Sequence, residues 1–180
     1  FSSLCIVILV NGINFVDGVH GLAILYVIIT ILLLNYFVYQ VNVEFINFED
    51  SLYLIPTLII LYFLNINEKV FLGDSGSYLL AAALGFSAIK ISNLENLSYP
   101  YVYANLLIYP AFEVLFSIVR KSINKKNPLN PDRKHLHHLI QNYFTRKKFS
   151  LKNSKIFTGI VINSFILFHG LNTIILKDLK

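Results

Sequence analysis

Hydrophobic residues in this chain gather in long unbroken runs, without the alternation typical of a half-buried β-strand. Three runs are about 19 to 21 residues long: Leu22 to Gln40, Tyr101 to Val119 and Ile156 to Leu176. At about 1.5 Å per residue, each can cross a hydrocarbon core of roughly 30 Å as an α-helix. Two shorter runs, Leu52 to Leu64 and Tyr78 to Ile91, reach that length only with their polar flanks. The pattern predicts an all-α, polytopic membrane helix bundle.

The chain begins in what looks like the end of another apolar run, Phe1 to Val10, and it contains no methionine. A cleaved signal peptide would leave a polar start instead. We therefore expect about five spans plus a partial N-terminal one, in a single membrane domain over residues 1–180. We also expect this domain to be the C-terminal fragment of a longer protein.

The composition agrees with a membrane protein and excludes other classes. Hydrophobic residues make up 56% of the chain and charged residues 14%, whereas a soluble domain carries roughly 25% charged residues. This difference excludes a soluble globular domain and a disordered chain. The single cysteine, Cys5, cannot form an internal disulfide, which excludes a disulfide scaffold.

Basic residues are concentrated in one segment. Of the 15 Lys and Arg residues, 11 lie between Arg120 and Lys155, where Asp132 is the only acid. The positive-inside rule predicts that this loop, residues 120–155, is cytoplasmic. Counting helices back from it places residues 11–21 and 65–77 on the same side.

Three polar clusters are predicted to share that cytoplasmic face: residues 11–21, 71–77 and 131–138. The first two each precede a span, so they lie at helix N-termini whose free N–H groups favour a phosphate. Asp17 and Asp74 suit a hard cation such as Mg²⁺, which takes one or two carboxylates plus phosphate oxygens. The alternative is that Asp74 and Ser75 only cap a helix.

The third cluster carries side chains that can donate hydrogen bonds to a diphosphate: Arg133, Lys134, His135, His137 and His138. A zinc site is a competing interpretation of three close histidines, although no cysteine is nearby. A solvated histidine patch is another.

Glu113 is an acid inside an otherwise apolar predicted span. An intramembrane acid is costly and indicates function by default. The alternative is a structural pair with Arg120, which lies on the same helix face.

Together, these clusters resemble the polyprenyl-phosphate N-acetylhexosamine-1-phosphate transferases, glycosyltransferase family 4, in the branch of undecaprenyl-phosphate GlcNAc-1-phosphate transferase-like enzymes. Residues 11–22 are similar to the family's N-x-x-N-x-x-D-G-x-D-G-L loop, and residues 71–77 to its F-x-G-D-x-G-S motif. Residues 130–140 are similar to its P-D-R-x-H-x-H-H stretch. Residues 109–121 also carry the family's proline, acid and basic pair.

The resemblance implies a membrane transferase at the first step of a cell-envelope glycan, such as lipopolysaccharide O-antigen. N-acetylhexosamine-1-phosphate passes from a UDP-sugar to undecaprenyl phosphate, which leaves UMP. The implied cofactor is Mg²⁺, with Mn²⁺ as an alternative. The implied partners are the UDP-activated N-acetylhexosamine, undecaprenyl phosphate, the lipid bilayer and a second copy in a homodimer, with no nucleic acid. The implied location is the bacterial inner membrane, with the active face cytoplasmic.

The resemblance also assigns roles to residues of this chain. The catalytic set is Asp74, Asp17, His135, His137 and His138, of which Asp74 and Asp17 are also the metal ligands. The substrate-binding set is Asn14, Gly18, His20, Asn65, Ser75, Gly76, Ser77 and Arg133.

Three departures from the family pattern accompany the resemblance. Before F-x-G-D the family often has an asparagine and a proline, whereas Asn65 and Asn67 occupy this region without the proline. His20 stands where the family loop usually has a second acid. The family's paired-aspartate motif belongs to an N-terminal half with no counterpart in these 180 residues, so we expect them alone to be inactive. Two alternatives stay open: a truncated, inactive copy of such an enzyme, and an anion transporter that binds its substrate at the N-termini of broken helices.

Overall fold

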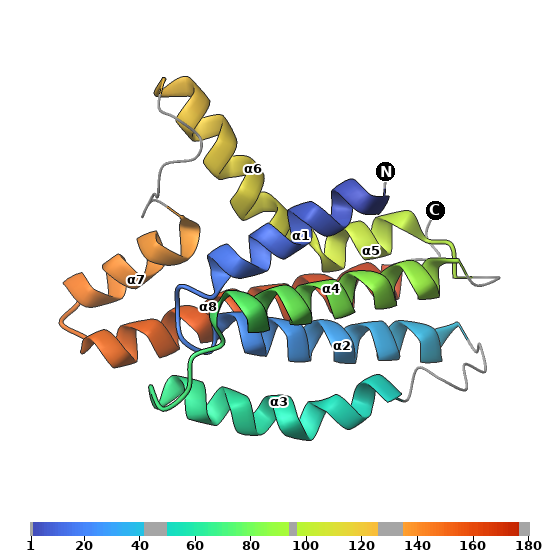
Figure 1. Cartoon of the computed structure of the whole chain (residues 1–180), viewed down its shortest axis with the longest axis horizontal. Helices are drawn as coiled ribbons and strands as arrows, with labels where there is room; N and C mark the ends of the chain where they lie inside the picture. The colour runs from blue at the N-terminus through green and yellow to red at the C-terminus, as the bar shows by residue number, and fades with distance from the viewer. Residues whose placement is uncertain (1, 42–49, 94–96, 126–134, 177–180) are drawn as a thin grey trace.

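The structure, a computed structural model, describes residues 2–41, 50–93, 97–125 and 135–176. Within these ranges the regular elements are all α-helices, and they pack into one bundle (Figure 1). In chain order they are α1 (Ser2–Val16), α2 (Leu22–Gln40), α3 (Asp50–Ile66), α4 (Gly73–Ser92), α5 (Pro100–Leu106), α6 (Ile108–Ile123), α7 (Leu136–Arg146) and α8 (Leu151–Ile175). The predicted all-α membrane bundle is confirmed.

Among the described residues, some of the predicted spans are helices long and apolar enough to cross a membrane, and others are shorter apolar helices. By length and composition, 2 described helices qualify, α2 and α8, or up to 3 if α5 and α6 count as one bent span. The apolar stretches of α1 and α3 are shorter, and α4 begins with a polar turn. The sequence predicts about five spans, and fewer of the described helices meet the length and composition criteria.

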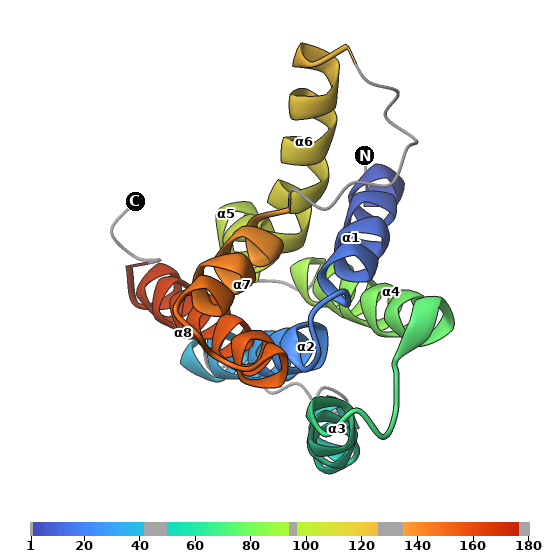
Figure 2. The same cartoon turned by 90° about the vertical axis from the view of Figure 1, so that its left-hand side faces the viewer.

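The predicted span from Tyr101 to Val119 is broken in two. α5 ends at Leu106, α6 begins at Ile108, and the two are bent by 69°. Pro110 lies in the first turn of α6, where its missing N–H removes no intrahelical hydrogen bond, so the local sequence suits the start of a new helix. α6 consequently stands out from the other helices (Figures 1 and 2).

α2 lies in the middle of the bundle and is apolar on all sides. It packs against α3, α4 and α8, and most of its side chains are buried. A helix without a polar face needs such cover, or lipid, around its whole circumference. The Tyr26 hydroxyl donates to the carbonyl of Leu106 at 3.1 Å, which ties α2 to the end of α5. On α8, a Cβ added at Gly170 would lie 2.5 Å from Leu33 Cδ1, so the glycine allows the two helices to approach.

α1 packs between α4 and α6, and this packing decides where the polar residues at its C-terminal end lie. Gly12 faces the backbone of Pro110 so closely that a Cβ would overlap with the Pro110 carbonyl. Gly85 of α4 faces Ile6 and Leu9 of α1 in the same way, with tight contacts of 3.4 and 3.3 Å for an added Cβ. The glycines let the three helices meet at short distance.

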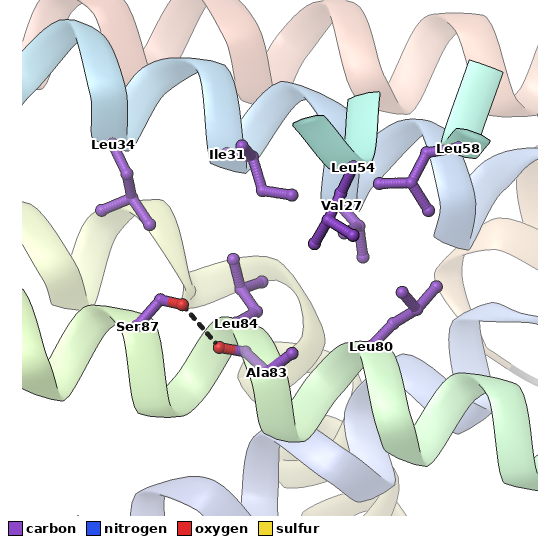
Figure 3. Close-up of a pocket in the computed structure, with 9 residues that line it drawn as sticks. All are labelled: Val27, Ile31, Leu34, Leu54, Leu58, Leu80, Ala83, Leu84 and Ser87. Atoms are coloured by element: carbon purple, nitrogen blue, oxygen red, sulfur yellow. Dashed lines mark hydrogen bonds between the residues drawn. The ribbon is translucent and has the colours of Figure 1, made fainter. Parts of the chain in front are cut away.

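The hollow between α2, α3 and α4 is small and apolar. It is a cavity of about 40 Å³ lined by aliphatic side chains and one serine (Figure 3). The Ser87 hydroxyl donates to the carbonyl of Ala83 in its own helix at 2.8 Å. This cavity therefore offers no group that would hold a phosphate or a sugar, and the polar chemistry lies elsewhere.

Candidate active site

The polar clusters meet at one end of the bundle, on the left in Figure 1 and facing the viewer in Figure 2. The end of α1, the starts of α2, α4 and α8, and α7 lie at this end. The structure therefore brings the predicted clusters at residues 11–21 and 71–77 together with the histidines of the third. Arg133 lies outside the described residues, so its substrate contact stays a prediction.

Asn14 and Ser77 fasten the end of α1 to the first turns of α4. Ser77 Oγ lies 2.8 Å from Asn14 Oδ1 and 3.0 Å from the carbonyl oxygen of Asp74. The Asn14 amide also donates to the Tyr78 hydroxyl at 3.4 Å. Ser77 is fully buried. Its hydroxyl thus links α4 to the half-buried Asn14 at the end of α1.

Asp17 and Asp74 lie near each other because these hydrogen bonds hold the end of α1 against the start of α4. Asp17 directly follows α1, and the backbone N–H of Gly73 donates to its carboxyl group. Burial and, to a smaller extent, the negative charge of Asp74 raise the pKa of Asp17 to about 6, although the Gly73 N–H acts in the opposite direction. Two carboxylates that repel each other in a partly buried site favour the binding of a cation.

The first turn of α4 leaves its acid available. The N-cap position is Leu72, and no side chain caps this helix, so the capping interpretation of Asp74 and Ser75 is not supported. Both side chains are exposed at the positive end of the helix dipole. Gly73 has a φ of 65°, and an added Cβ would meet nothing within 4 Å, so the space before this turn is open. Gly76 faces the Leu72 side chain instead.

The donor set of this site fits a hard cation better than zinc. Mg²⁺ takes one or two carboxylates, which Asp17 and Asp74 could provide. Water and phosphate oxygens complete its coordination shell. Among the residues that the structure describes, no group of three or more His, Cys, Asp or Glu side chains could hold a metal ion. The zinc interpretation of the histidines is therefore not supported.

Glu113 of α6 is the centre of the histidine cluster. Its fully buried carboxylate accepts at Oε1 from the Tyr109 hydroxyl at 3.0 Å, from His137 Nδ1 at 3.0 Å and from the His137 backbone N–H at 3.4 Å. Its Oε2 lies 3.2 Å from His135 Nδ1 and accepts from the Leu136 backbone N–H at 3.3 Å. Leu136 and His137 begin α7, so Glu113 also supplies the negative charge at the N-terminus of the helix that carries the histidines. These donors satisfy a charge that would otherwise be costly to bury.

Glu113 decides which nitrogen of each ring carries a proton. An ionised carboxylate only accepts hydrogen bonds, so Nδ1 of His135 and Nδ1 of His137 are both donors. The other nitrogen of His137, Nε2, is buried and has no hydrogen-bond partner. It lies 3.7 Å from the position that a Cβ would take on Gly18, the residue after Asp17. A buried polar atom without a partner thus faces the loop that carries the acid.

His138 lies over the same loop. Its Cε1 is 3.6 Å from the Cβ position of Gly18, and its ring centroid is 4.4 Å from that of His137. Burial lowers the pKa of His138, and the charge of His137 acts in the same direction. The His135 ring packs between His137 and Phe15, with centroid distances of 5.4 and 5.0 Å. The three predicted catalytic histidines are thus together, and two of them reach the Asp17 loop.

His20 belongs to a second polar group at this end. Its Nε2 lies 3.3 Å from Lys155 Nζ and its Nδ1 lies 3.7 Å from Glu68 Oε1, while Lys155 pairs with Glu68 at 3.3 Å. The exposed Phe71 ring packs edge-on against His20 at 5.3 Å. Burial, followed by the charge of Lys155, lowers the pKa of His20. In the structure His20 joins α8 to two loops, and its substrate contact stays a prediction.

Asn65 holds two loops together. Its Oδ1 accepts from the Gly21 N–H at 2.6 Å, and its Nδ2 donates to the carbonyl of Val70 at 3.0 Å. Gly21 has a φ of 80°, which glycine adopts without strain. Both ends of the buried Asn65 amide are therefore engaged inside the protein, and its substrate contact stays a prediction.

Sequence reasoning identified Glu113 as an unusual acid but missed its partners and missed Tyr109. The structure joins Glu113 to His135 and His137, at sequence separations of 22 and 24 residues. The available signal was chemical: a buried acid requires donors, and the nearby loop is rich in histidine. Spacing along one helix pointed to Arg120 because it considers only local neighbours.

Comparisons with known proteins show the family of the chain. The family model of Glycosyl transferase family 4 matches residues 1–92. The undecaprenyl-phosphate alpha-N-acetylglucosaminyl 1-phosphate transferase of Thermotoga maritima is 38% identical over 58% of this chain and 32% of the relative. The decaprenyl-phosphate N-acetylglucosaminephosphotransferase of Mycolicibacterium smegmatis is 32% identical over 73% of this chain and 37% of the relative. A probable undecaprenyl-phosphate N-acetylglucosaminyl 1-phosphate transferase of Bacillus subtilis is 28% identical over 76% of this chain. The chain spans about a third of the length of these curated relatives.

Proposed function

Because the chain belongs to glycosyl transferase family 4, we propose that it forms the phosphate-binding part of an enzyme that transfers N-acetylhexosamine-1-phosphate from a UDP-sugar to undecaprenyl phosphate. The products are a polyprenyl-diphospho-sugar and UMP. We place the active end at the cytoplasmic face of the bacterial inner membrane, at the first step of a cell-envelope glycan. The names of the relatives support the prenyl phosphate acceptor and the phospho-sugar.

One observation carries this proposal: the unpartnered, buried Nε2 of His137 faces the loop of Asp17, which in turn lies beside Asp74. A ring nitrogen and two carboxylates thus lie on or beside the same loop. Phosphoryl transfer needs positioning and charge neutralisation more than covalent help from the protein. An imidazole and a carboxylate-bound cation supply both.

In the mechanism that we propose, an oxygen of the lipid phosphate attacks the sugar-proximal phosphorus of the UDP-sugar. The new P–O bond forms as the bond to the UMP oxygen breaks, and UMP leaves. Asp17 and Asp74 would hold Mg²⁺, which supplies positive charge to the diphosphate when bound. The backbone N–H groups at the start of α4, other than that of Gly73, would add an anion site, and the open space before Gly73 would give access to it.

The histidines would act at the opposite side of the diphosphate. His137 presents Nε2 to a phosphate oxygen, while Glu113 holds its Nδ1 and balances a positive charge on the ring. His138, over the same loop, adds a second contact. Ser77 and Asn14 keep Asp17 against α4 during turnover.

The test is UMP release by membranes that contain the product of the complete open reading frame. The membranes are incubated with undecaprenyl phosphate, Mg²⁺ and a panel of UDP-N-acetylhexosamines. UMP that requires both the lipid and the divalent cation supports the proposal, and the sugar that yields it identifies the donor. If correctly inserted protein releases no UMP with any sugar, the proposal is wrong. The result would then favour the alternative of an inactive copy of such an enzyme.

A further inference from the structure

The turn between α7 and α8 exposes basic and apolar side chains away from the candidate active site. We define the α7–α8 corner by its exposed residues: Tyr143, Arg146, Lys147, Lys148, Phe149 and Leu151. The stretch from residue 135 to residue 155 contains no acid. The corner is therefore both positively charged and apolar, a combination that a surface facing only water does not need.

Aromatic packing and hydrogen bonds hold the two helices together at the corner. The rings of Phe144, Phe149 and Phe157 pack against one another with centroid distances of 5.1 to 5.8 Å. Lys148 has a φ of 67°, and the Phe149 N–H donates back to the Phe144 carbonyl at 3.3 Å, which makes the turn tight. The Thr145 hydroxyl lies 3.2 Å from Ser154 Oγ and braces α7 against α8.

The length of α8 places the corner at the level of the lipid headgroups. α8 has 25 residues, about 37 Å at about 1.5 Å per residue, whereas the hydrocarbon core is roughly 30 Å thick. Its first five residues include Lys152 and Lys155, and they follow the N-cap Ser150. These residues thus extend beyond the apolar core, and Figure 1 shows the α7–α8 hairpin reaching past the other helices at this end of the bundle.

We propose that the α7–α8 corner binds the surface of a bilayer that contains anionic phospholipids. Arg146, Lys147 and Lys148 pair with headgroup phosphates, while Tyr143 and Phe149 lie among the headgroups and upper acyl chains, where aromatic side chains are favoured. An acidic protein would match the charge, but it would not explain exposed apolar residues continuous with a membrane span. The continuity with α8 is the reason to choose the bilayer. This proposal does not depend on the transferase activity.

A tryptophan at the corner can report which lipid lies there. These 180 residues contain no tryptophan, so Phe149→Trp introduces a local fluorophore, and the same protein without this change provides the background. The full-length protein is reconstituted in vesicles of phosphatidylcholine and phosphatidylglycerol, with either one brominated as a quencher. We expect stronger quenching by brominated phosphatidylglycerol at low salt, and a loss of this preference at high salt because the contacts are electrostatic.

The charge contribution is separated by matched variants. The double substitution Lys147→Gln and Lys148→Gln should lower the preference for phosphatidylglycerol over phosphatidylcholine. The decrease should reach about 30-fold if both lysines lie at the membrane surface. Lys69→Gln with Lys125→Gln removes the same charge from exposed lysines outside the corner and should leave the preference unchanged. Equal quenching by both lipids in the parent would overturn the anionic preference. Quenching by neither would show that protein covers the corner. Leu151→Trp replaces the reporter if Phe149→Trp fails to insert.

Discussion

Glu113 Oε1 lies 3.0 Å from Nδ1 of His137, although 24 residues separate them in the chain and they sit on different helices. The contact links α6, the part of the broken span that stands out from the bundle, to the start of α7. A carboxylate on one imidazole nitrogen orients the ring and leaves the other nitrogen for a ligand. The unpartnered Nε2 of His137 is that nitrogen.

Glu113→Gln should lower turnover by about 10²-fold or more, because an amide cannot accept from both imidazoles and from the start of α7. It should also change the pH profile of kcat, since the charge that balances the His137 ring is lost. The measurement is UMP release against pH by inserted protein. Tyr109→Phe is the matched control: it removes one donor to Glu113 but keeps both histidines, so its effect should stay below about tenfold. Equal losses in the two variants would assign Glu113 a packing role only.

Asp74→Asn should abolish UMP release while membrane insertion stays normal, because the variant loses a charge that the proposed Mg²⁺ requires. Asp74→Glu keeps the charge and should retain measurable turnover, with a higher Mg²⁺ concentration for half-maximal rate. A titration of Mg²⁺ for both variants measures this. Near-normal turnover of Asp74→Asn would refute the role of Asp74.

His137→Ala and His138→Ala should each reduce kcat by about 10²-fold or more, as the loss of an oriented, charge-stabilising donor does. His169→Ala is the control, because His169 lies on α8 beside Asn105, 3.2 Å away, outside the cluster. It should keep parental turnover. Losses below tenfold for both cluster variants would assign these histidines a structural role only.

The stability of the protein should fall at mildly acidic pH through His20. Burial and the charge of Lys155 lower the pKa of His20 below its ordinary value of 6.5, so the unfolded chain takes up this proton more readily than the folded chain. The contribution of His20 is therefore complete above its unfolded pKa and is lost as the pH falls toward its folded pKa. His20→Asn should reduce the fall of Tm in detergent between about pH 7.5 and about pH 5.5. An unchanged slope would contradict the assignment, and His169→Asn supplies the comparison.

The two ends of the bundle should face opposite sides of the membrane. In a Cys5→Ser background, Tyr39→Cys marks the end of α2, and Ser150→Cys marks the start of α8; both positions are exposed. A membrane-impermeant thiol reagent applied to intact cells should label Tyr39→Cys, and Ser150→Cys only after permeabilisation. Labelling of both from the same side would overturn the predicted topology.

The sequence alone determined the helical class, and it predicted which residue types form the candidate site. A long unbroken apolar run satisfies its backbone groups within the segment when it forms a helix, so the all-α membrane bundle followed from local pattern. Asp17 and Asp74 were recognisable because glycines and a following apolar run mark their positions at helix starts. The histidine cluster was recognisable in the same way, from neighbours within one short segment.

The tertiary structure decided which of these groups meet. The bend between α5 and α6 turned one predicted span into two helices. The packing of α6 on α1 and of α7 on α8 accompanies the contacts of Glu113 with His135 and His137. Likewise, Asn65 and His20 lie among partners from distant segments, which no spacing within a motif reveals. The physical reason is that hydrophobic periodicity is a local property, whereas the partner of a buried polar group depends on how separate helices pack.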